Sequence, residues 1–245
     1  MAELTVLGSC GAWPEANRAC AGFLLEHDGY RVVLDLGYGT LPRLLERLPA
    51  ANLDAVIVTH AHPDHCVDVS ALARVRQYTA ADSPKLPLHC APGVLEVLEA
   101  LEPRPHPSTI FEFHGLDGTR DLGPFRLETF ELPHYVPNFG VRLSAPGLTV
   151  AYTGDSGPSP VLAGLGAGAD LFVMDATLQG PSPESGPRYV MTATEAAHWA
   201  TRAGAKRLLL THFWPGSDRS VSVREASAAF DGEIIAAEEG LTLKL

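Results

Sequence analysis

Short apolar runs, most of them ending in a polar residue, alternate along the chain with stretches of helical spacing. The run at residues 55–59 is continuously apolar and β-branched and leads directly into His60, as is typical of a strand buried on both faces. Comparable runs lie at residues 4–7, 21–26, 31–36, 86–89, 148–152, 171–174 and 207–211. This alternation of short strands with helices predicts an α/β fold.

Turn and cap residues locate the connections between these elements. Asp28 and Gly29 predict a hairpin turn between two of the strands. Thr192 followed by Glu195 is the pattern of a capping box, and Gly204 stands where a C-terminal glycine would end that helix. Further helices are expected at residues 41–48, 69–77 and 94–101, with a loop at 60–65 and another at 179–187.

The second half of the chain repeats the pattern of the first half. Strands of the first half run into Asp35 and His60, and strands of the second half run into Asp155, Asp175 and His212. This repetition suggests a two-layered pseudo-repeat. Because no linker divides the halves, we expect a single domain over residues 1–245.

Composition and charge narrow the class of protein. The chain has 245 residues, of which 46% are hydrophobic and 19% charged, so it can bury a sizeable core and is not an extended disordered protein. It has no apolar stretch of about 20 residues and no basic-then-apolar start, which predicts a cytoplasmic protein without a membrane segment. A net charge of 18 − 29 = −11 disfavours binding to extended nucleic acid.

The chemistry concentrates in the sequence His-Ala-His-Pro-Asp-His at residues 60–65, which holds four metal-competent side chains. Imidazole and carboxylate groups suit zinc and similar divalent ions. His60 and His62 point the same way from an extended segment, whereas Asp64 and His65 follow the change of direction at Pro63. One loop can therefore serve two metal ions. The alternative, a solvated histidine-rich turn, requires neither the preceding buried strand nor the aspartate.

This segment resembles the HxHxDH signature of the metallo-β-lactamase fold, a four-layer αβ/βα sandwich of two mixed sheets flanked by helices. The resemblance extends over nearly the whole chain, from residues 7–9 and 33–37 to 153–156 and 210–212. It is greatest to the ribonuclease Z-like branch, because His134 precedes a Gly-Val-Arg strand and residues 175–177 read acid-Ala-Thr.

The resemblance implies a metal-dependent hydrolase with two divalent ions. It assigns one ion to His60, His62 and His134, the second to Asp64, His65 and His212, and a bridging role to Asp155. Zinc is preferred because the set is rich in histidine, and manganese or iron would satisfy the same donors. Two such ions can share a hydroxide that attacks phosphorus, which favours phosphodiester hydrolysis.

The residues available for proton transfer differ from those of the ribonuclease Z-like branch. Val190 and Met174 stand where ribonuclease Z proteins have histidines. His198, on the predicted helix close to the vacated position, is a candidate replacement. Asp64 is a candidate proton acceptor while it is a ligand, and Asp175 is expected either to assist catalysis or to orient a ligand.

The expected substrate is a small phosphodiester, with cyclic nucleotides among the candidates. Only 155 − 134 = 21 positions separate the third histidine from the bridging aspartate, which leaves room for two strands and a turn but not for the long basic arm of tRNA-processing members. The layout is similar to compact actinobacterial cyclic-nucleotide phosphodiesterases. The alternatives are an ester, thioester, lactone or β-lactam hydrolase, a tRNA 3′-end endonuclease, and a non-catalytic metal-binding domain. The resemblance allows a homodimer, since relatives are often dimers, but no feature of the sequence marks an interface.

Overall fold

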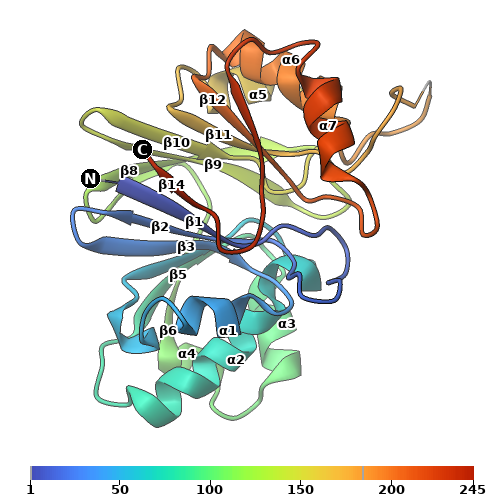
Figure 1. Ribbon diagram of the computed structural model, residues 1–245. Coiled ribbons are helices and arrows are strands. Elements are labelled where there is room, and N and C mark those ends of the chain that lie inside the picture. The colour runs from blue at the N-terminus through green and yellow to red at the C-terminus, as the bar shows by residue number, and fades with distance from the viewer. Residues whose placement is uncertain (1, 184) are drawn as a thin grey trace. The chain divides into compact units, whose positions relative to one another are not determined.

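The computed structural model describes residues 2–183 and 185–245, which form two compact units (Figure 1). Unit 1 comprises the described residues within 1–9, 13–116 and 238–244. Unit 2 comprises those within 10–12 and 117–237, with residue 245. Each unit contains one seven-stranded mixed sheet and its own helices. The predicted α/β class with two mixed sheets is confirmed, and the single domain stays a prediction.

The sheet of unit 1 has the strand order β14-β1-β2-β3-β4-β5-β6. Its strands are β1 (Ala2–Gly8), β2 (Gly22–His27), β3 (Tyr30–Leu36), β4 (Ala55–Val58), β5 (Leu86–Cys90), β6 (Phe111–Gly115) and β14 (Thr242–Lys244). Strands β3 to β6 are parallel, whereas β1 pairs antiparallel with β2 and β14, and β2 pairs antiparallel with β3. Asp28 and Gly29 form the predicted hairpin turn with φ of 50° and 80°.

The helices of unit 1 pack against one face of this sheet (Figure 1). They are α1 (Thr40–Leu45), the short 3₁₀ helix η1 (Ala50–Asn52), α2 (Pro63–Thr79), α3 (Val94–Leu101) and α4 (Pro107–Ile110). Val56 and Leu88 of the sheet share one buried hydrophobic cluster with Val69 and Leu72 of α2. Burying these side chains from both layers removes apolar surface from water and stabilises the arrangement.

The predicted loop at residues 60–65 is partly wrong, because α2 begins at Pro63 and includes Asp64 and His65. The physical reason is local. Proline suits the first helical position, because its missing N–H would have no partner within the helix there. An aspartate in the first turn interacts favourably with the helix dipole. The helix predicted at residues 69–77 therefore forms only the later part of α2.

The sheet of unit 2 has the strand order β13-β12-β11-β10-β9-β8-β7. Its strands are β7 (Thr119–Leu122), β8 (Phe125–Leu132), β9 (Asn138–Ala145), β10 (Leu148–Tyr152), β11 (Leu171–Asp175), β12 (Arg207–Thr211) and β13 (Glu233–Ala236). Strands β10 to β13 are parallel and β7 to β10 are antiparallel. The interval between His134 and Asp155 holds β9, a turn and β10, as predicted.

Three helices cover one side of the second sheet (Figure 1). They are α5 (Val161–Leu165), α6 (Ala193–Ala203) and α7 (Arg219–Ala226). The capping box predicted for α6 is confirmed, since the Glu195 amide donates to Thr192 Oγ1 at 3.2 Å and the Thr192 amide donates to Glu195 Oε2 at 2.9 Å. Gly204 ends the helix with φ of 66°. None of the helices in the described parts of the chain combines the length and apolar composition that crossing a membrane requires.

Candidate metal centre

The four side chains of the histidine motif converge where β4 ends and α2 begins. His60 follows β4, and His62 is the N-cap residue of α2. His60 Nε2 lies 3.1 Å from His62 Nδ1, and the His60 and His65 ring centroids are 4.1 Å apart. His65 Nε2 lies 3.6 Å from Asp64 Oδ2. Because His60 and His65 are fully buried and Asp64 is nearly so, these groups form a preorganised cluster of nitrogen and oxygen donors.

Asp35, buried at the end of β3, orients two of these histidines. Its carboxylate accepts hydrogen bonds from His65 Nδ1 at 2.7 Å, from the Thr59 amide at 2.7 Å and from Thr59 Oγ1 at 2.9 Å. Since the Thr59 hydroxyl donates to Asp35, it accepts from His60 Nδ1, which lies 3.1 Å away. Both imidazoles thus carry their proton on Nδ1, and each Nε2 is left as the metal-binding atom.

Unit 2 supplies a second set of donors, arranged around one carboxylate. His134 follows β8, Asp155 follows β10 and His212 follows β12. Asp155 Oδ2 lies 3.7 Å from His134 Nε2, and Asp155 Oδ1 lies 3.2 Å from His212 Nε2. His134 Nδ1 donates to the Tyr189 carbonyl at 2.9 Å. Each Nε2 therefore faces one oxygen of a carboxylate that is only 3% exposed.

Asp175 orients His212 through a threonine, much as Asp35 orients His60. Thr177 Oγ1 donates to Asp175 Oδ1 at 2.6 Å and lies 2.8 Å from His212 Nδ1. The hydroxyl therefore accepts from that imidazole, and the proton stays on Nδ1. Burial raises the pKa of the Asp175 carboxyl; His212 opposes this rise and the charge of Asp155 adds to it. Asp175 is thus linked to a predicted ligand by two successive hydrogen bonds through Thr177.

Two of these residues have strained backbones. Asp35 and His212 have φ of 55° and 59°, a left-handed conformation that costs free energy for residues other than glycine. Gly11 leaves room for the His212 ring, because a Cβ at this position would lie 2.7 Å from His212 Cε1. Similarly, a Cβ on Gly37 would lie 1.8 Å from the Asp64 carbonyl oxygen. Both glycines are thus required by close approach to the donors.

The donor chemistry fits a divalent metal ion. Each of the seven predicted ligands belongs to a group of histidine and aspartate side chains that could hold one. The donors are imidazole nitrogen and carboxylate oxygen, which suit zinc, manganese or iron. The orientation of four imidazoles by hydrogen bonds at Nδ1 is the arrangement seen for metal-binding histidines generally.

The structure places His198, the candidate proton donor, on the exposed side of α6. It lines a surface cavity of about 370 Å³ with Pro158, Glu195, Trp199 and Arg202. Met174 is fully buried in β11. A catalytic role for His198 stays a prediction.

Apart from Asp175, sequence reasoning did not find the residues that orient the ligands. Asp35, Thr59, Thr177 and the Tyr189 carbonyl contact histidines, but most of them are distant from those histidines in sequence. One signal was available: Asp35 lies near the end of an apolar strand, as Asp175 lies at the end of another. An acid in that place is buried and therefore requires hydrogen-bonding partners.

Residues 30–213 match the family model described as Beta-lactamase superfamily domain. The chain belongs to this family. It is 29% identical over 241 residues to the probable metallo-hydrolase YhfI of Bacillus subtilis, covering 97% of this chain and 98% of that protein. It is 31% identical to the uncharacterized protein ML1173 of Mycobacterium leprae, covering 99% and 88%. It is 27% identical to the ribonuclease Z of Haloferax volcanii, covering 98% and 94%.

Solved structures show the same fold. The crystal structure of YhfI from Bacillus subtilis matches with a TM-score of 0.90 and 28% identity over all of both chains. The short form of human tRNase Z matches with 0.80 and 23% identity, covering 99% of this chain and 98% of that one. A diphosphatase of the PhnP family matches with 0.75 and 21%, covering 100% and 98%. The protein is thus a metal-dependent hydrolase with the metallo-β-lactamase fold, and the predicted resemblance is confirmed.

Proposed function

We propose that this hydrolase is a phosphodiesterase that uses two divalent metal ions, with a small, nucleotide-like phosphodiester as its substrate and cyclic nucleotides among the candidates. The observation that carries the proposal is the common orientation of His60, His65, His134 and His212. Each is held at Nδ1 by an acceptor, so that Nε2 is left to bind metal. We assign the two ions to the ligands that the family resemblance implies.

Bound divalent ions would lower the pKa of water and offset negative charge on phosphoryl oxygens. The side chains of the protein have separate tasks in this reaction. Asp155 offers one carboxylate oxygen to each of two imidazoles, which suits a bridging ligand. We assign to Asp64 the acceptance of the proton from the attacking water. Asp175 keeps His212 in its Nδ1-protonated form through Thr177.

Two observations support a small phosphodiester over tRNA. The hairpin of β9 and β10 occupies the interval in which tRNA-processing members carry a basic arm. A net charge of −11 repels an extended phosphate backbone. The type of reaction has separate support: relatives and structural neighbours include a ribonuclease and a diphosphatase, whose names describe cleavage of phosphorus–oxygen bonds. A compact acidic protein with this chemistry therefore favours a substrate with few phosphates.

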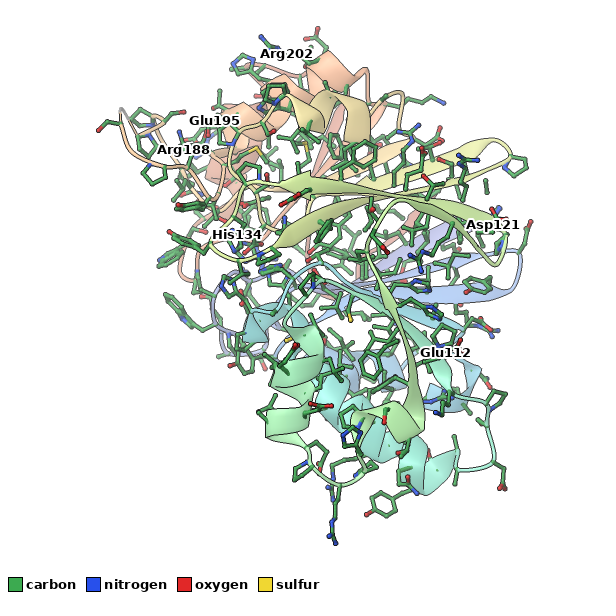
Figure 2. The ribbon with its side chains drawn as sticks, turned by 180° about the vertical axis from the view of Figure 1, so that it is seen from behind. Glu112, Asp121, His134, Arg188, Glu195 and Arg202 are labelled. Carbon is green, nitrogen blue, oxygen red and sulfur yellow. The ribbon has the colours of Figure 1, made fainter. Side chains whose placement is uncertain are left out.

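The test is a hydrolysis panel with zinc-loaded and manganese-loaded protein. The substrates are cyclic AMP, an aryl phosphodiester and a simple lactone. We expect metal-dependent hydrolysis of the phosphodiesters that falls by about a hundredfold or more in Asp155→Asn, with loss of bound metal by elemental analysis. The matched control is Asp121→Asn, which changes an exposed aspartate in β7 of the same unit (Figure 2).

Each other outcome of this panel contradicts the proposal in its own way. Turnover of the lactone alone would assign the protein to carbonyl chemistry. Binding of metal without turnover of any substrate would indicate a non-catalytic metal-binding domain. Equal turnover before and after removal of metal would contradict metal-dependent hydrolysis altogether.

A further inference from the structure

An exposed tyrosine stands directly beside a predicted metal ligand. Tyr135 follows His134 in the chain and is 70% exposed. Its ring centroid lies 4.1 Å from that of Tyr189 at an interplanar angle of 39°, and 5.2 Å from that of His134 at 76°. Two rings therefore hold the Tyr135 ring in place while most of its surface stays accessible.

Tyr189 is itself held in place, through its own carbonyl and through the residue that precedes it. Its carbonyl accepts the hydrogen bond from His134 Nδ1. The preceding residue, Arg188, makes two hydrogen bonds with the Glu195 carboxylate at 3.1 and 2.7 Å (Figure 2). Close packing at Gly157 adds to this, because a Cβ there would lie 2.0 Å from the Arg188 carbonyl oxygen. The segment that carries Tyr189 is thus fixed relative to His134.

We propose that Tyr135, supported by Tyr189, is a stacking platform for the nucleobase of the substrate. An aromatic ring that is already held in place binds a flat partner without a large loss of side-chain entropy. Stacking on an aromatic residue is favourable for every base, because each base has a π face. This inference rests on the proposed function: it names nucleotides, rather than simple alkyl phosphodiesters, as the preferred substrate class.

Another aromatic pair, Phe213 and Trp214, follows His212 in the chain. Trp214 is 48% exposed, less than Tyr135. Phe213 is only 2% exposed, and the Arg219 guanidinium lies 5.0 Å from its ring centroid. Its faces are therefore covered by protein. Tyr135 combines exposure, immobilisation and contact with a ligand imidazole, and for this reason we assign the platform to it.

The kinetic test compares cyclic AMP with the abasic ribose 3′,5′-cyclic phosphate in the metal-loaded enzyme. We expect Tyr135→Leu to lower kcat/KM for cyclic AMP by about tenfold, mainly through KM. The abasic compound should change by less than about twofold, because it has no base to stack. Tyr135→Phe, which keeps the ring, should retain the preference. An equal loss with both substrates in Tyr135→Leu, or no loss with either, would overturn the platform.

Tyr78→Leu is the matched control, since it removes another exposed tyrosine, 73% accessible, near the far end of α2 from His65.

A binding measurement tests the platform independently of the hydrolysis reaction. We expect adenosine monophosphate to bind the wild type about tenfold more tightly than ribose 5-phosphate by calorimetry, and this difference to vanish in Tyr135→Leu. Base-dependent binding without turnover would contradict only the proposed function. Equal binding of the two compounds, or no binding of adenosine monophosphate, would overturn the platform.

Discussion

Two buried carboxylates, Asp35 and Asp175, set the protonation state of the predicted ligands. Each accepts a hydrogen bond from a threonine hydroxyl that in turn accepts from an imidazole Nδ1. Asp35 also holds His65 directly. Burying an acid costs free energy unless it is hydrogen-bonded. The hydrogen bonds that Asp35 and Asp175 accept offset this cost.

Asp35→Asn tests the role of the first carboxylate. Asparagine has the same shape and tolerates the left-handed backbone at this position, but it has one uncharged acceptor oxygen where Asp35 accepts hydrogen bonds from His65 and Thr59 with two. We expect the affinity for zinc to fall by about 10–100-fold in a competition titration with a chelator. Asp54→Asn is the control, because Asp54 accepts from the Arg31 amide in the same unit. Unchanged affinity in Asp35→Asn would show that the carboxylate does not orient the ligands.

Gly11→Ala tests the close approach of the backbone to His212. The added Cβ would lie 2.7 Å from His212 Cε1, so the imidazole must shift. Because misplacing a reacting group by about 1 Å can cost about a hundredfold in rate, we expect a loss of that order in kcat. Gly164→Ala, whose Cβ would meet Phe130 at an ordinary 3.7 Å, should leave kcat unchanged. Wild-type turnover in Gly11→Ala would refute a fixed position for His212.

At the scale of elements, strand ends and helix starts bring the donors together. Motif residues leave β4 and enter the first turn of α2, where Pro63 and Asp64 favour helix. In unit 2 the capping box of α6 also affects a predicted ligand. Glu195 binds Arg188, and the carbonyl of the next residue, Tyr189, accepts the hydrogen bond from His134. Helix capping and ligand orientation are therefore connected through one carboxylate.

Glu195 makes a pH-dependent contribution to stability. Although burial opposes the shift, hydrogen bonds from Arg188, Thr192 and Ser182 hold the pKa of Glu195 below its usual value. Its contribution is therefore complete above the unfolded pKa of about 4.3 and is lost as the pH falls through the lower folded pKa. We expect Glu195→Gln to lower the free energy of unfolding by about 1–2 kcal/mol at pH 7.

Urea unfolding of the wild type and Glu195→Gln from pH 7 down to pH 3.5 measures this contribution. The difference between the two proteins should shrink as the pH falls below about 4.3, because the wild-type carboxyl becomes protonated. Thr192→Ser preserves a hydroxyl cap and serves as the control for the helix start. A difference that stays constant over this range would assign the effect to something other than the charge of Glu195.

At the scale of the whole molecule, local patterns predicted most elements, whereas contacts between distant residues were not predictable. The apolar runs marked β4, β10 and β12, and the Thr192–Glu195 pair marked α6, because these signals lie within a few residues. The early start of α2 was missed because the motif was interpreted only as a loop. The contact of Asp35 with His65 joins residues 30 positions apart. Hydrogen bonds between residues so far apart leave no repeating pattern in the sequence.

The measurement that tests the central claim most directly is a metal titration of the stripped protein while the hydrolysis of cyclic AMP is followed. We expect no turnover without metal and a rise to a plateau at two zinc or manganese ions per chain, because both ions are needed to activate water and to neutralise the phosphoryl group. Full turnover in the stripped protein, or two bound ions without turnover of any phosphodiester, would contradict a two-metal phosphodiesterase.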